Sequence, residues 1–170
     1  MVHFFIGLDH PAVAWPFVRS MISINTIRDR KGPFRVNDWI MDSGGFTELS
    51  TYGRWRTSPK EYAAQINRWK DNGNLVAAVT QDLMCEPFIL HKTGLSVDDH
   101  QKITVERYAR LIDLTNVYVM PVLQRLLAGL LRYPRLSLRG TLNARSMGWR
   151  WQCLQAQWKS RSDRRHSPGH

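Results

Sequence analysis

The sequence has only two cysteines, Cys85 and Cys153, and no long apolar run in its 170 residues. Two distant cysteines cannot build a disulfide framework or, alone, a closed zinc site. No apolar segment approaches the ~20 residues that span a membrane, and the N-terminus lacks the basic start and small-residue cleavage site of a signal peptide. These absences predict a cytoplasmic protein with reduced thiols and no membrane contact.

Acidic residues are almost missing from the last 46 residues, where Asp163 is accompanied by ten lysines and arginines. Residues 1–124 carry 14 basic and 13 acidic residues, a net charge of +1, whereas the whole chain carries +10. The first segment therefore has the composition of an ordinary globular sequence, long enough for one domain with a core. We divide the chain into a folded segment, 1–124, and a basic tail, 125–170.

Four short apolar runs recur in the folded segment: HFFIGL (3–8), DWIMDS (38–43), LVAAVTQD (75–82) and VYVMPVLQ (117–124). Their nearly continuous apolar character is typical of strands that are buried on both faces of a parallel sheet. Helix-like segments separate the runs, and this alternation predicts an α/β fold built from right-handed βαβ units.

Three connecting segments are predicted to be helical. The first covers residues 12–24. The second begins at the N-cap Ser58, with Pro59 as its first residue and Glu61 completing a capping box, and the third begins after Ser96. The residues predicted to face the core are Tyr62, Ile66 and Trp69 in the second helix, and Ile103, Tyr108, Leu111 and Ile112 in the third.

Each apolar run is followed by, or ends in, a polar side chain, and these are Asp9, Asp42, Asp82 and Gln124. A single acidic residue after a strand is often just the cap of the next helix. In parallel α/β folds, however, functional groups gather at the carboxyl ends of the strands. Three carboxylates and an amide at successive strand ends predict a shared active site.

The segment MDSGGFTEL is the sharpest local signal. Gly44 and Gly45 follow a buried strand, where they let the backbone approach a flat ligand or make a tight turn. Asp42 is placed to act as a base or nucleophile, and Phe46 can stack on a planar ring. The alternative is that Asp42 or Ser43 caps a short helix and Phe46 belongs to the core.

The segment VTQDLMCEPF repeats this arrangement on the next strand. Asp82 can accept hydrogen bonds from the N–H groups of a guanine-like edge, or it can cap a helix. We interpret Cys85 as a structural residue, because no cysteine or histidine stands near it at ligand spacing. The histidines His3, His91 and His100 form no metal set, and we predict that they are surface or loop residues.

Together, WIMDSGGFTEL, QDLMCEPF…TGLSVDDHQKITVERY and VYVMPVLQ resemble the deazapurine DNA modification protein A family, relatives of the tRNA-guanine transglycosylases. The resemblance covers residues 1–124, and the MCEPF segment points to the branch that acts on DNA. It implies the N-terminal half, about four βα units, of a (β/α)8 TIM barrel. It also implies that guanine in a DNA substrate is exchanged for a 7-deazaguanine base such as preQ0, with partner proteins of a DNA modification system possible.

By this resemblance, Asp42 is a catalytic acid/base, and the base-binding residues are Ser43, Gly44, Gly45, Phe46, Asp82 and Gln124. Thr47 stands where the tRNA enzymes usually have glutamine. The family's nucleophilic aspartate and its zinc-binding cluster of cysteines and histidine are expected farther along the chain. Neither is visible here, so no cofactor is assigned to this chain.

The tail departs from the family after Gln124 and holds nine arginines and eight leucines. Codons that encode the Trp-rich segment Met147–Lys159 can be read one nucleotide out of register as an alternating apolar and glycine strand. We therefore expect residues 125–170 to be an out-of-frame product with little order, and the chain to be a truncated, inactive transglycosylase. Two alternatives remain open: a small basic nucleic-acid-binding protein that uses the tail, and an unrelated metabolic TIM-barrel enzyme.

Overall fold

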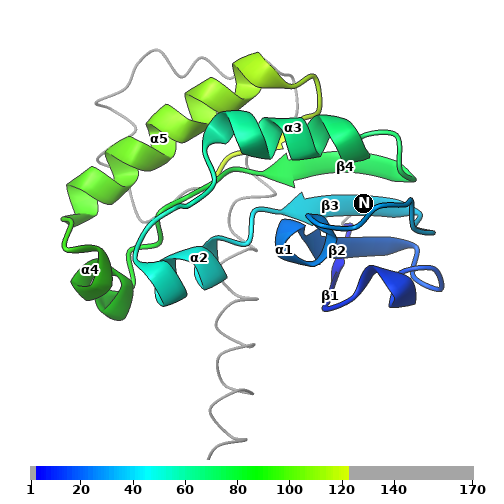
Figure 1. The fold of residues 1–170 in the computed structure, drawn as a ribbon, viewed down its shortest axis with the longest axis horizontal. Coiled ribbons are helices and arrows are strands. Elements are labelled where there is room, and N and C mark those ends of the chain that lie inside the picture. Colours follow the sequence, from blue (N-terminus) through cyan, green and yellow to red (C-terminus); the bar gives the residue numbers. More distant parts are fainter. Residues whose placement is uncertain (1–2, 123–170) are drawn as a thin grey trace, which may run out of the picture. The chain divides into compact units, whose positions relative to one another are not determined.

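The computed structural model describes residues 3–122, which form an α/β unit around a five-stranded sheet (Figure 1). The strands are β1 (Ile6–Leu8), β2 (Arg19–Ser23), β3 (Asp38–Asp42), β4 (Asn74–Val79) and β5 (Val119–Met120). The helices are η1 (Pro11–Val13), α1 (Ile24–Ile27), α2 (Gly45–Tyr52), α3 (Pro59–Trp69), α4 (Pro87–Thr93) and α5 (Val97–Leu114). All strand pairs are parallel, and the order in the sheet follows the order in the chain.

The four predicted strands are present as β1, β3, β4 and β5, although each is shorter than its apolar run and β4 begins one residue before the run, at Asn74. The helix predicted over residues 12–24 is wrong, because β2 occupies most of its second half. Pro16 interrupts the segment, and the apolar residues beyond it gain more from pairing with strands on both sides than from a helix. Ser20 and Ile22 are buried, and β2 joins β1 to β3.

The other two predicted helices are confirmed down to their caps. The Ser58 hydroxyl accepts from the Glu61 backbone N–H at 3.2 Å while the Glu61 carboxylate accepts from the Ser58 N–H at 2.7 Å. Ser96 and Asp99 make the same reciprocal pair at the start of α5. Each box satisfies two of the N–H groups that a helix end leaves without partners.

Of the side chains predicted to face the core, Tyr62, Ile66, Trp69 and Leu111 are buried and Ile103 and Tyr108 are partly buried. The prediction for Ile112 is wrong, because its side chain is 46% exposed. The buried face of α5 runs instead through His100, Thr104 and Leu111. These spacings of four and seven residues leave Ile112 turned about a quarter-turn away.

The largest core cluster fills the space between the sheet and helices α3 and α5, which lie over one of its faces (Figure 1). The ring of Trp39 in β3 is fully buried there, with its centroid 5.4 Å from that of Phe34, and its Nε1–H donates to the carbonyl of Asn72 at 2.7 Å. Burying a ring of this size contributes more than any single polar contact. Ile40, Ala77 and Val79 form a second cluster on the opposite side of the strands.

The carboxyl ends of the strands point to one edge of the sheet, and helices α2 and α4 lie at this edge (Figure 1). Helix α2 follows directly from β3, whereas α4 follows the loop that leaves β4. The side chains that the sequence marks as a candidate site are therefore carried by one edge of the sheet.

Candidate functional site

Asp42 is the last residue of β3 and lies beside Ser23, the last residue of β2. Its Oδ2 accepts a hydrogen bond from the backbone N–H of Gly44 at 3.0 Å. Burial at the sheet edge raises the pKa of the Asp42 carboxyl, and hydrogen bonds from Gly44, the Ser23 hydroxyl and Ser43 oppose this effect. A carboxyl whose pKa is raised by burial while it is held by several donors is suited to exchange a proton with a bound molecule.

The turn between β3 and α2 needs glycine for its own geometry. Gly44 has φ +72°, and a side chain there would place a Cβ atom only 2.3 Å from the Asn25 Nδ2. That nitrogen donates to the Gly44 carbonyl at 3.3 Å, so Asn25 holds the turn from the side of α1. Gly45 lies under the Trp55 ring, whose nearest atom would be 3.0 Å from an added Cβ.

The alternative interpretation of this segment, a helix cap followed by a core phenylalanine, does not hold. Gly44 occupies the N-cap position of α2, and no side chain caps that helix. Ser43 is buried, whereas Phe46 is 48% exposed. The Phe46 ring meets the ring of Phe88 from α4, with 6.2 Å between centroids and 68° between planes. An exposed ring at this edge is available to a planar ligand.

Asp82 lies in the loop that leaves β4 and is 9% exposed. Its backbone carbonyl accepts a hydrogen bond from the Trp55 Nε1–H at 3.2 Å. The same carbonyl would lie 3.6 Å from a Cβ built on Gly45. The backbone after β4 therefore reaches the turn after β3, which brings the two predicted site segments together.

Helix α5 clamps the loop that carries Asp82. The Thr104 hydroxyl accepts from the Leu83 N–H at 2.9 Å and donates to the carbonyl of His100 at 2.8 Å. The His100 ring donates from Nδ1 to the Met84 carbonyl at 2.8 Å, and its Nε2 lies 2.8 Å from the Thr93 Oγ1. The prediction that His100 is a surface or loop residue is therefore wrong, because it is fully buried in this clamp.

His3 and His91 are exposed, as predicted. The role of His100 and Thr104 depends on contacts with residues that stand 16 and 21 positions earlier in the chain. The local signal for these contacts is that two polar residues, His100 and Thr104, stand four positions apart on the buried face of a helix.

An ion pair between the buried Glu48 and the half-exposed Arg56 holds the loop between α2 and α3. Glu48 is 1% exposed, and its carboxylate accepts from the Arg56 Nη2 at 2.9 Å and the Arg56 Nε at 3.2 Å. These hydrogen bonds lower the pKa of Glu48. The loop also carries Trp55, so this pair supports the ring that packs on Gly45.

Cys85 does not have the properties of a reactive or metal-binding thiolate. Partial burial, with the nearby charges of Glu86 and Asp82, raises the pKa of its thiol to about 11. Within residues 3–122, no group of three or more histidines, cysteines and acidic residues is arranged to hold a metal ion. These residues do not fit the zinc cluster that the resemblance implies for the family, and we assign no step to zinc.

One of the predicted strand-end residues, Asp9, does not join this site, and another lies outside the described residues. Asp9 follows β1 and is exposed, and β2 lies between β1 and β3, the strand that carries Asp42. Gln124 lies outside the described residues, as do Cys153 and the whole predicted tail, 125–170. The residues that share the edge are thus Asp42, Ser43, Gly44, Gly45, Phe46 and Asp82.

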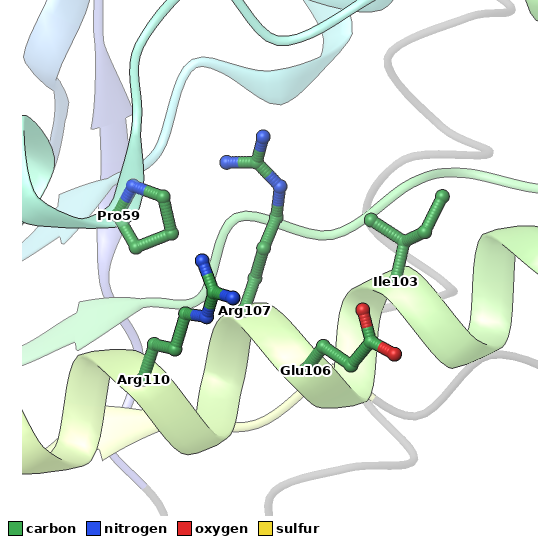
Figure 2. Close-up of a pocket in the computed structure, with 5 residues that line it drawn as sticks. All are labelled: Pro59, Ile103, Glu106, Arg107 and Arg110. Carbon is green, nitrogen blue, oxygen red and sulfur yellow. The ribbon is translucent and has the colours of Figure 1, made fainter.

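A pocket of about 190 Å³ lies between α3 and α5 and contains none of the predicted site residues (Figure 2). It is lined by Pro59, Ile103, Glu106, Arg107 and Arg110. The Arg107 Nη1 donates to the Gln81 Oε1 at 2.9 Å and to the Thr57 carbonyl at 3.3 Å. Arg107 therefore links α5 to the segment that follows β4. We interpret it as a residue that stabilises the site and does not contact the ligand.

Comparison with known proteins yields one match. The model of the family described as DpdA, DeoxyPurine in DNA protein A, matches residues 2–130. No curated protein and no solved structure matches the chain. Among the helices described in residues 3–122, none combines the length and the apolar character that crossing a membrane requires.

Proposed function

The chain belongs to the DeoxyPurine in DNA protein A family, and we propose that it carries part of the site of a DNA-guanine transglycosylase. The proposed reaction exchanges guanine in DNA for a 7-deazaguanine base of the preQ0 type. The observation that supports the proposal is the set of side chains gathered at the carboxyl ends of β3 and β4. A carboxyl with a raised pKa, Asp42, stands there with an exposed ring, Phe46, and a second carboxylate, Asp82, in the loop that follows the neighbouring strand.

The exchange breaks one glycosidic bond and forms another, so it needs no oxidant or reductant. Guanine leaves the deoxyribose C1′ and takes up a proton, and the incoming 7-deazaguanine loses a proton as its own bond to C1′ forms. Asp42 is proposed to give and take these protons near the sugar. Its raised pKa supports this role, because proton transfer is most effective when the pKa of the group lies close to the working pH.

The remaining residues are proposed to bind the base. The Asp82 carboxylate accepts from the N–H groups of the guanine edge, and Phe46 stacks on the ring. Ser43, Gly44 and Gly45 offer backbone groups beside it. Gln124 is proposed to donate its amide N–H to the base carbonyl. The firm attachment of the Asp82 loop to α5 supports this proposal, since an edge-reading carboxylate has to be held in place.

We also propose that the sheet is the beginning of a (β/α)8 barrel. Five parallel strands in chain order, without a reversal of strand order, agree with this architecture and differ from a doubly wound sheet. The nucleophile and zinc ligands then belong to the later barrel strands, and residues 125–170 replace these through a shift of reading frame. DNA, the 7-deazaguanine base and partner proteins of a modification system are the proposed partners.

The two alternative functions receive no specific support. The nucleic-acid-binding alternative depends on the arginines of the tail, which lie outside the described residues. A metabolic enzyme of another family does not account for the match over residues 2–130.

The proposal is tested with a frame-restored protein and labelled preQ0. Incorporation of label into DNA is expected, and Asp82→Asn is expected to raise the KM for the base about 5- to 150-fold with a smaller effect on kcat. The substitution turns one acceptor into a donor that faces an N–H group, which costs about 1–3 kcal/mol. Glu106→Gln, on the outer face of α5, is the matched control. If no label enters DNA, the proposed reaction is wrong.

A further inference from the structure

Phe88 is a second exposed ring at the sheet edge, beside Phe46. Phe46 is the second residue of α2 and Phe88 is the second residue of α4, and they are 48% and 43% exposed. Their centroids are 6.2 Å apart. A pair of large aromatic side chains that keeps this much surface in water contributes little to the core, and such exposed pairs are common at binding sites.

Helices α2 and α4 hold the two rings on one support. At the amino ends of the helices the two phenylalanine rings meet, and at the carboxyl ends Gly53 lies so close to Lys92 that an added Cβ would be 3.0 Å from the Lys92 carbonyl. The helices therefore run side by side in the same direction. Beneath them lies one buried cluster, formed by Leu49, Leu83, Met84 and Ile89.

The angle between the rings determines what they can hold. Because the planes are 68° apart, a flat heterocycle that stacks on one ring meets the other ring at its edge. Edge-to-face and stacked contacts are the two favourable aromatic geometries, and this corner provides both to one planar group. Aromatic side chains are the usual stacking platforms for unpaired bases in single-stranded DNA.

Basic side chains lie at the other end of the same two helices. Arg54 and Lys92 are both exposed, and the contact between Gly53 and Lys92 places them near each other. Arg54 stands eight residues after Phe46 and Lys92 four residues after Phe88, so the basic end lies roughly 6–12 Å along the helices from the rings at ~1.5 Å per residue. Rings for a base and cations for the backbone, at this spacing, match the charge and composition of a nucleic-acid strand.

We propose that Phe46 and Phe88 form an aromatic corner that holds an unpaired base of the DNA strand, with Arg54 and Lys92 along the adjoining phosphates. Phe88 thereby becomes a DNA-contacting residue in addition to those proposed above. The inference rests on the proposed function for the choice of DNA as the polymer. It does not require exchange activity, because binding alone depends on the corner.

The experiment uses the 170-residue chain and a single-stranded oligonucleotide with 5-iododeoxyuridine at one position. After irradiation, mass spectrometry locates the crosslinked residue, and affinity is measured at ~0.2 M salt to reduce non-specific contacts with arginine. Crosslinks to Phe46 or Phe88 are expected. Phe88→Leu is expected to lose the crosslink at position 88 and to bind about tenfold more weakly, because one aromatic stacking surface for the base is removed.

Phe4→Leu is the matched control, because Phe4 is 61% exposed and precedes β1, at the amino-end edge of the sheet. It is expected to bind as the wild type does. Crosslinks that avoid both rings, or Phe88→Leu with wild-type affinity and a wild-type circular dichroism spectrum, would overturn the proposal. Incorporation of preQ0 by the frame-restored protein is a separate measurement, so failure of the corner at Phe88 is distinguished from failure of the exchange function.

Discussion

Replacing Gly44 by alanine should destabilise the turn that holds Asp42 through two separate effects. The first effect is backbone strain, because it costs a residue with a Cβ atom about 1–2 kcal/mol to adopt the φ of +72° found at position 44. The second effect is a clash, because the added Cβ would lie 2.3 Å from the Asn25 Nδ2. The Asn25 side chain then has to move, and the loss of its hydrogen bond to the Gly44 carbonyl costs about 1 kcal/mol. We expect Gly44→Ala to lower the free energy of unfolding by roughly 2–3 kcal/mol.

Two comparison variants separate these effects. Gly94 has a similar φ of +70° with no atom within 4 Å of an added Cβ, so Gly94→Ala should cost only the backbone share, about 1–2 kcal/mol. Asn25→Ala alone should cost about 1 kcal/mol, and it should cost almost nothing when Gly44→Ala is already present, because the bond is then lost.

The assay is urea unfolding followed by circular dichroism, with the four variants compared at a constant m-value. Additive effects of Asn25→Ala and Gly44→Ala would refute the reasoning, since they would mean that the two residues do not share this contact. Equal costs for Gly44→Ala and Gly94→Ala would likewise show that the close approach of Asn25 plays no part.

Three further predictions concern the surroundings of the site. Thr104→Val leaves the buried Leu83 N–H without its acceptor, so it should cost about 1–3 kcal/mol and speed amide exchange in the Asp82 loop, while Thr51→Val on exposed α2 surface should do neither. Glu48→Gln should cost about 1 kcal/mol or less at neutral pH by chemical denaturation, because the Arg56 side chain is 46% exposed and solvent screens the pair. Because Arg56 lowers the folded pKa of Glu48, this stabilisation is present above the ordinary value of 4.5, and the wild type should lose it as pH falls through the lowered folded pKa; a pH-independent difference would contradict the ion pair. Cys85, with a pKa of about 11, should be alkylated roughly a hundredfold more slowly at pH 8 than an unperturbed thiol, as measured by mass spectrometry of its peptide.

Local signals predicted the capped helices well, because a cap is made by residues three positions apart. Ser58 with Glu61, and Ser96 with Asp99, needed no information from the rest of the chain. Strand β2 is different, since its conformation depends on pairing with β1 and β3, and its apolar residues also fit a helical spacing.

The candidate site was predictable as a set of residue types but not as an arrangement. The sequence pattern indicated that Asp42 and Asp82 end neighbouring strands; β3 and β4 are neighbours and Asp42 ends β3, but β4 ends at Val79 and Asp82 lies in the loop beyond it. It did not show that Asn25 requires glycine at position 44, or that His100 lies buried against the Asp82 loop. Both facts depend on contacts between segments far apart in the chain, which periodicity and spacing do not report.

The most direct test of the central claim is incorporation of labelled preQ0 into DNA by the frame-restored protein with and without Asp42→Asn. The substitution keeps the shape of the side chain but removes its charge and its proton-accepting oxygen. Because burial raises the pKa of Asp42, the charged form is disfavoured in the folded protein, so the variant should be at least as stable as the wild type at neutral pH. We predict that exchange is abolished while the Tm is unchanged or higher. Near-normal turnover by the Asp42→Asn protein would contradict the assignment of Asp42 as the catalytic acid/base.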